Sequence, residues 1–356
     1  MAFRLGLIKI SVWIFQFVLA FSSGIFKVLT PYVTSSFHEH ALTATTSVVA
    51  SIASGIIKLP YAKLLNVWGR PQCMTTMVAC VTVGAVVMAA CQNVETYCAA
   101  QVFWSVGYYG IQFSLIIFIA DATTMYHRAF IMGFISTPSA VSIWAYGPAA
   151  ESVLKTIGLG WGVGVWCIFI AVFSSPLLFL MFKHEREEYD SGLITKSQSS
   201  RTIRQSVAYY CRELDVVGLS SLAAGLCLLL LAISIYSHQP KGWQSPMIVA
   251  FIILGFVLIV IFVLYEKYLA PETFFPWTLL KDRTVVFTNI MAAALYTSEF
   301  VCSQNIYSML IISFDQSVTN ATYIKNIYMV GASIWNLILG VAFRWNSHIK
   351  WYAFCL

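Results

Sequence analysis

The stretch SGIIKLPYAKLLNVWGRPQC, residues 54–73, decides how this chain folds. It begins inside one long apolar run, passes through a short turn that holds Gly69 and Arg70, and ends where the next apolar run starts. Runs of about 20 apolar residues have the length that an α-helix needs to cross about 30 Å of hydrocarbon. The stretch therefore predicts two membrane-spanning helices that are joined by a short, polar, basic turn.

The composition of the whole chain agrees with this prediction. Of 356 residues, 59% are hydrophobic and 10% are charged, and the mean hydropathy is +0.77. Soluble domains carry about 25% charged residues, and barrel strands are about half as long as these runs. We therefore expect an all-α, polytopic helical membrane protein with about ten spans of about 20 residues each. The expected spans lie near residues 7–30, 43–65, 74–92, 98–120, 129–149, 161–182, 214–236, 246–266, 286–310 and 322–343.

The residues behind the net charge of +6 lie mainly in the loops between these spans. With the N-terminus in the cytoplasm, most lysines and arginines fall in cytoplasmic loops, and only Lys155, Lys241 and Lys325 fall outside. This asymmetry is the positive-inside rule, so we expect a cytoplasmic N-terminus and no nucleic-acid partner. The sequon Asn320-Ala321-Thr322 lies in a predicted outer loop, which makes Asn320 a glycosylation candidate.

Several short motifs along the chain match a known pattern. They are YVTSSF at 32–37, IAD at 119–121, ELDVVGL at 213–219, LLKDRTVV at 279–286 and QSV at 316–318 followed by Tyr323-Ile324. Together they resemble the signatures of fungal siderophore–iron transporters, a fourteen-span branch of the major facilitator superfamily. The turn with Asn66, Gly69 and Arg70 is similar to the loop that latches the inward-closed state in that superfamily, although Asn66 replaces its aspartate.

The resemblance implies the fold and the activity. Superfamily members have two six-helix halves that rock around a site at the bilayer midplane. The family implies secondary transport of ferric siderophores, coupled to protons, in the plasma membrane or in an endosomal or vacuolar membrane. The iron stays inside its chelate, so we expect neither a cofactor nor protein metal ligands, and the sequence shows no cluster at metal-ligand spacing.

The same resemblance divides the chain into four parts. Residues 1–182 are expected to form the first six-helix bundle, and 214–266 two additional spans. Residues 183–213 are charged and rich in serine, which is typical of a cytoplasmic linker. Residues 267–356 then supply two spans of a second bundle, so we expect the chain to be truncated after the tenth span.

Polar residues inside the spans are the candidates for a transport pathway. In the fourth span, Gln101, Ser105, Tyr108 and Gln112 recur at spacings that place them on one helix face. Such a stripe either lines a cavity or bonds neighbouring helices. In the first span, Lys27 shares a stripe with Gln16 and Ser23. It either faces the interior or reaches out to the membrane interface.

The ninth predicted span carries a carboxylate. Tyr296, Glu299 and Tyr307 recur on one face of it. A carboxylate near mid-span costs about 2.5–3.5 kcal/mol, so Glu299 is expected to carry a proton or contact substrate, or else to bond a neighbouring helix. At the inner end of the fourth span, Asp121 is expected to pair with Arg128.

Three functions fit these observations. The first is siderophore uptake, the second is drug or metabolite efflux by the same fold, and the third is a truncated membrane protein that transports nothing. An enzyme is not expected, because the sequence has no HExxH motif, no suitable GxSxG motif and no phosphate-binding glycine-rich loop.

Overall fold

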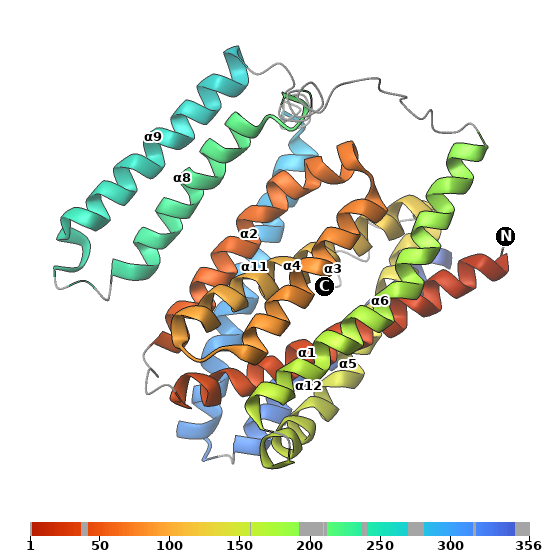
Figure 1. The fold of residues 1–356 in the computed structure, drawn as a ribbon, viewed down its shortest axis with the longest axis horizontal. Coiled ribbons are helices and arrows are strands. Elements are labelled where there is room, and N and C mark those ends of the chain that lie inside the picture. The colour runs from red at the N-terminus through yellow and green to blue at the C-terminus, as the bar shows by residue number, and fades with distance from the viewer. Residues whose placement is uncertain are drawn as a thin grey trace.

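The computed structural model describes residues 2–36, 42–156, 158–191, 209, 212–236, 239, 241–269, 281–315 and 318–345. Long α-helices make up almost all of these residues, and no strand occurs among them (Figure 1). The helices are α1 (Ala2–Ser36), α2 (Leu42–Trp68), α3 (Arg70–Ala90), α4 (Val94–Ala122), α5 (Met125–Thr156), α6 (Leu159–Asp190), α8 (Val216–Ile235), α9 (Pro246–Tyr268), α11 (Arg283–Ile312) and α12 (Val318–Trp345). The predicted all-α class is confirmed for the described chain.

Nine helices in the described ranges are long and apolar enough to cross a membrane. They confirm the prediction of a polytopic membrane protein. The expected span over residues 286–310 lies within the single helix α11 (Arg283–Ile312).

Helices α1, α3, α4, α5 and α6 pack around one shared apolar core, and α2 packs on α4 with a smaller cluster of its own at Tyr61, Leu65 and Cys73. The tightest contact in this bundle joins α3 to α4. A Cβ atom added to Gly107 of α4 would lie 2.4 Å from the backbone nitrogen of Val81, and one added to Gly84 of α3 would lie 2.5 Å from that of Trp104. Glycine at both positions thus lets the two backbones touch, as small residues do in membrane helix pairs.

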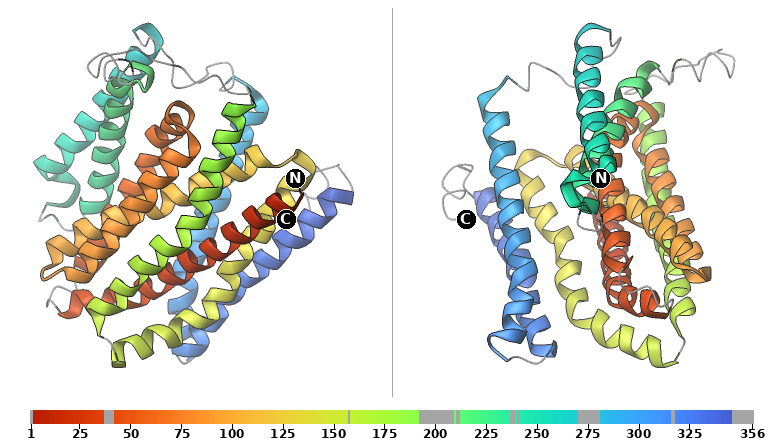
Figure 2. Two further views of the ribbon diagram at one scale, coloured as in Figure 1. Left: turned by 45° about the vertical axis from the view of Figure 1, so that its right-hand side comes forward. Right: turned by 90° about the vertical axis from the view of Figure 1, so that its left-hand side faces the viewer.

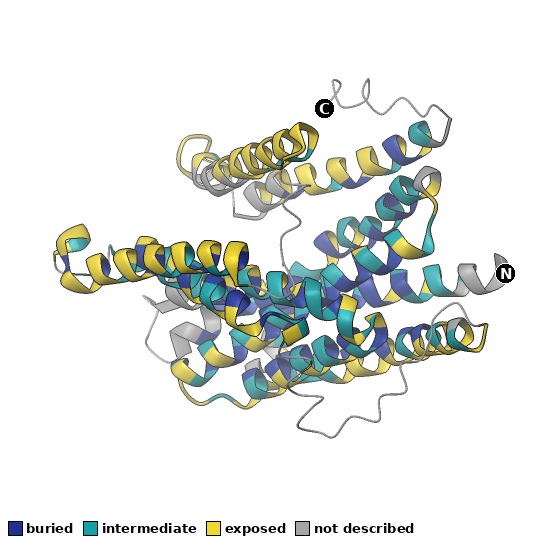
Figure 3. Cartoon of the chain, turned by 90° about the horizontal axis from the view of Figure 1, so that it is seen from above, coloured by how far each residue is buried: buried dark blue, intermediate teal, exposed yellow. Residues whose placement is uncertain are grey.

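The remaining helices pack on two sides of this bundle. The hairpin of α8 and α9, joined through a 3-10 turn at Gly242–Gln244, lies against α2 (Figure 1). On another side, α12 packs along α5, and α11 packs on α12 (Figure 2). Most described side chains of α9 and α11 are exposed, whereas α1 and α4 are largely buried (Figure 3).

Three local expectations differ from the structure. Helix α1 continues to Ser36, so most of the motif at 32–37, expected in a loop, is helical, and its last residue lies outside the described ranges. Helix α6 continues to Asp190 and so enters the predicted linker, because lysine and glutamate there are good helix formers. Asn320 is exposed in the first turn of α12 instead of in a loop before it.

Candidate functional site

The predicted polar stripe of α4 faces α1. The side-chain amide of Gln16 in α1 donates to Oε1 of Gln112 at 2.9 Å. The hydroxyl of Tyr108 forms hydrogen bonds with the side chains of Ser23 and Gln112. These contacts show that part of the stripe, here Tyr108 and Gln112, bonds a neighbouring helix, which is one of the two roles expected for it.

The same face of α4 also carries an aromatic cluster with unused hydrogen-bonding groups. The ring of Trp104 stacks on that of Tyr108 with centroids 5.0 Å apart, and it lies 5.2 Å from the ring of Phe26 in α1. Trp104 is only 8% exposed, yet its indole nitrogen has no hydrogen-bond partner. Oε1 of Gln101, one turn away, is also buried without a partner. A buried donor and acceptor without partners cost free energy unless something else binds them.

Trp104 was not among the residues that sequence analysis selected. Its signal was present, because it lies three residues after Gln101 and four before Tyr108, on the same helix face. An indole counts as apolar in a search for polar stripes, although it carries one N–H donor. We define Gln16, Ser23, Gln101, Trp104, Tyr108 and Gln112 as the α1–α4 cluster.

The predicted latch turn occupies the end of the bundle where α2 meets α3. Gly69 alone separates the two helices and adopts a φ of 106°, which favours glycine over residues with a Cβ. Together with Asn66 and Arg70 it lines a hollow of about 460 Å³, which also touches the ends of α4 and α6. The three latch residues are therefore brought together with parts of the chain that are remote in sequence.

The predicted ion pair between Asp121 and Arg128 is wrong. Asp121 instead accepts from Arg70, at 3.0 Å from Nε and 2.9 Å from Nη2. Arg128 donates from Nη2 to the carbonyl oxygen of Ala120 at 2.6 Å. The turn before α5 directs Arg128 to the backbone at the end of α4, and the latch turn presents Arg70 to the free carboxylate.

A second contact at this end was not predicted. The amide of Gln72 in α3 donates to both carboxylate oxygens of Glu185 in α6, at 3.0 and 2.9 Å. Residue 185 falls in the predicted linker, and the continuation of α6 is what places it beside α3. The latch end is thus held by one ion pair and one amide–carboxylate contact.

The structure does not bring the other candidates to the α1–α4 cluster. Glu299 and Tyr296 are both exposed on α11, whose main neighbour is α12. The side chain of Tyr307 lies outside the described part of the structure. Lys27 is exposed, so it does not join the buried Gln16 of its own stripe.

Among the residues that the structure describes, no group of three or more histidine, cysteine, aspartate or glutamate side chains is arranged to hold a metal ion. The α1–α4 cluster instead offers aromatic faces, amides and hydroxyls. Such groups bind an uncharged or chelated organic ligand through stacking and hydrogen bonds.

The sequence of this chain is similar to those of fungal membrane transporters. The family model described as "Fungal trichothecene efflux pump (TRI12)" matches residues 6–355. The chain is 43% identical over 344 residues to "MFS siderochrome iron transporter 1" of Ajellomyces capsulatus, covering 97% of this chain and 58% of that protein. It is 35% identical over 352 residues to "MFS siderochrome iron transporter D" of Aspergillus fumigatus, covering 98% and 58%. It is 33% identical over 343 residues to "Siderophore iron transporter mirB" of Emericella nidulans, covering 96% and 57%.

These matches run along nearly the whole of this chain, although the chain spans less than three fifths of each of those relatives. The relatives are named as transporters, in line with the expectation that the chain is not an enzyme. The helical spans, the sequence motifs and the relatives all indicate the same protein family. The chain belongs to the fungal family that the matching model describes, within the major facilitator superfamily, and is homologous to the fungal siderochrome iron transporters.

Proposed function

We propose that this protein takes part in secondary active transport of ferric siderophore chelates. The curated relatives named above supply the class of cargo. The observation that carries the proposal on this chain is the α1–α4 cluster, where the Trp104 N–H and Oε1 of Gln101 are buried without partners. A ferric siderophore presents carbonyl and hydroxamate oxygens as well as amide N–H groups, so it would complete both bonds.

Alternating access is the proposed mechanism. The first bundle, proposed as residues 1–182, and the second, proposed as 267–356, would rock about the cluster, with 183–213 as the linker and 214–266 as an additional hairpin. The pair of Arg70 and Asp121 would hold one closed state at the latch end. We place that end in the cytoplasm, as the distribution of basic residues predicts, in a plasma, endosomal or vacuolar membrane.

Protons are the proposed coupling ion. Glu299 is exposed on α11, and a carboxylate within a predicted span favours a hydrated or protonated role. Efflux of a drug or metabolite is the second candidate, because the matching family model is described as an efflux pump. The direction of net movement separates the two candidates.

The assay for the proposal is uptake of a radiolabelled ferric hydroxamate by yeast that lacks its own siderophore transporters. We would test this chain, and also the chain extended by any coding sequence that follows Leu356 in the transcript. We expect uptake that collapses when a protonophore removes the proton gradient. Glu299→Gln is expected to abolish the response to the gradient, while Glu95→Gln, an exposed carboxylate in the first turn of α4, retains it.

Each result of this assay decides between the candidates. Outward movement of preloaded cargo without uptake would favour efflux. The absence of any movement from both versions, with protein present in the membrane, would support the third reading, a membrane protein that transports nothing. An undiminished proton response in Glu299→Gln would remove that residue from the coupling mechanism.

The role of Trp104 has its own test. Trp104→Phe retains an aromatic ring beside Tyr108 but removes the N–H donor. We expect KM for uptake to rise about 5- to 30-fold, which corresponds to about 1–2 kcal/mol for a lost hydrogen bond. The melting temperature in detergent should change little, since removal of an unsatisfied buried donor offsets the lost packing. A large fall in melting temperature with unchanged KM would mean that the indole only packs.

A further inference from the structure

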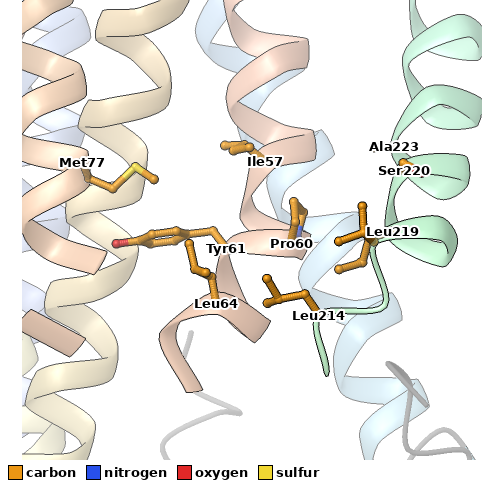
Figure 4. Close-up of a pocket in the computed structure, with 10 residues that line it drawn as sticks. Ile57, Pro60, Tyr61, Leu64, Met77, Leu214, Leu219, Ser220 and Ala223 are labelled. Atoms are coloured by element: carbon orange, nitrogen blue, oxygen red, sulfur yellow. The ribbon is translucent and has the colours of Figure 1, made fainter. Parts of the chain in front are cut away.

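The seam between α2 and α8 contains two apolar hollows in succession. The first, of about 290 Å³, lies where α2 ends and α8 begins (Figure 4). It is lined by Ile57, Pro60, Tyr61 and Leu64 of α2, Met77 of α3, and Leu214, Val216, Leu219, Ser220 and Ala223 at the start of α8. The second, of about 320 Å³, lies further along the same two helices and includes Gly55, Leu59 and Leu226.

The packing of this seam differs from that of the neighbouring helix pairs. Between α8 and α9, a Cβ atom added to either Gly225 or Gly255 would lie 3.0 Å from the carbonyl oxygen of the other glycine, so these backbones touch. A Cβ atom added to Gly55 of α2 would meet no atom within 4 Å. The hairpin is thus internally tight, whereas its contact with α2 leaves open apolar space between the two helices.

The polar groups at the first hollow are already satisfied inside the protein. The ring of Tyr61 points away from α8 (Figure 4), and its hydroxyl forms a hydrogen bond with Ser114 of α4. The hydroxyl of Ser220 donates to the carbonyl oxygen of Val217 at 3.0 Å. Apolar space of this kind does not hold ordered water, which needs two to four polar partners. In a chain embedded in a bilayer, hydrocarbon fills it.

Charges at the end of the seam indicate the kind of lipid. In the sequence, Lys63 of α2 comes directly before Leu64 and the exposed Arg212 comes two residues before Leu214, and both leucines line the first hollow. The acids Asp215 and Glu266 at that end are both buried, and Asp215 accepts from the backbone nitrogen of Gly218, so Glu213 is the remaining described acid there. Basic residues next to an apolar groove attract anionic lipid headgroups.

We propose that the seam is a binding site for an anionic phospholipid. Its acyl chains lie between α2 and α8, and its headgroup lies beside Lys63 and Arg212. The lipid adds to the direct contact between α8 and α2. The proposal holds whatever cargo the protein carries, because it rests on the seam alone.

The test is native mass spectrometry of the chain purified in a mild detergent, followed by headgroup analysis of the extracted lipid. Ala223→Phe fills the first hollow, whereas Ala224→Phe makes the same change on the exposed side of α8. We expect the unaltered chain and Ala224→Phe to retain phospholipid that is enriched in phosphatidylserine or phosphatidylinositol, and Ala223→Phe to lose it. Should Ala223→Phe fail to fold, Ser220→Leu fills the hollow from one turn earlier.

A second pair of variants tests the preference for an anionic headgroup. Arg212→Gln is expected to lower the anionic share of the bound lipid, while Lys241→Gln, at the opposite end of α8, leaves that share unchanged. Equal lipid content in the two phenylalanine variants would overturn the site. A headgroup composition equal to that of the host membrane would overturn the choice of an anionic lipid.

Discussion

Gly107→Leu is expected to prevent the chain from assembling. Even a Cβ atom at this position would lie 2.4 Å from the backbone nitrogen of Val81 and 2.8 Å from the carbonyl oxygen of Met77. Backbone atoms of a packed helix cannot swing aside as a flexible side chain does, so α3 and α4 would have to separate. We expect a cost above about 3 kcal/mol, the upper end for added bulk in a well-packed core.

The measurement is the fraction of monodisperse protein after detergent extraction, together with its melting temperature. The matched control is Gly331→Leu in α12, because a Cβ atom there would meet nothing within 4 Å. Gly107→Ala should fall between the unaltered chain and Gly107→Leu. If both leucine variants extract equally well, the close contact of α3 with α4 does not limit assembly.

Much of this fold was predictable from local signals. Apolar runs bounded by short polar turns predicted the helices, and the sequence around Gly69 predicted the turn that joins α2 to α3. The ends of helices were less predictable, because residues there can have high helix propensity although they are too polar for a membrane span. The polar end of α6 is not apolar enough for a span, yet its residues form helix readily, so α6 continues to Asp190.

The candidate site was predictable only as far as one helix determines it. Spacing alone placed Gln101, Tyr108 and Gln112 on one face of α4, and the structure shows that face directed to α1. Contacts with residues of other helices could not be predicted from spacing. Asp121 was assigned to Arg128 because the two are near in sequence, whereas assembly of the bundle brings Arg70 closer. Periodicity also selected Glu299, but it does not reveal which neighbour a helix faces.

Asp121→Arg is expected to reduce transport at least about tenfold, which corresponds to about 1.4 kcal/mol. The pair of Arg70 and Asp121 is half exposed, with side-chain exposures of 44% and 50%, so it contributes little to folding itself. In the proposed mechanism, its effect is on the balance between closed and open states, which differ by only a few kcal/mol. Replacing attraction by repulsion between two arginines at the latch end shifts that balance by the lost attraction and the added repulsion together.

Exchanging the charges of two residues tests which arginine is the partner of Asp121. Arg70→Asp combined with Asp121→Arg restores an ion pair in the reverse order, so uptake should recover substantially in the double variant. Arg128→Asp combined with Asp121→Arg should not recover, because Arg128 bonds the carbonyl of Ala120 instead of the carboxylate. Uptake rates normalised to the amount of protein in the membrane measure all of these variants. If uptake recovers in the double variant at positions 128 and 121 but not in the one at positions 70 and 121, Asp121 pairs with Arg128, as expected from the sequence. Recovery with residue 70 alone would show that the latch works through a contact between the α2–α3 turn and the end of α4, even though Asn66 stands where the superfamily has an aspartate.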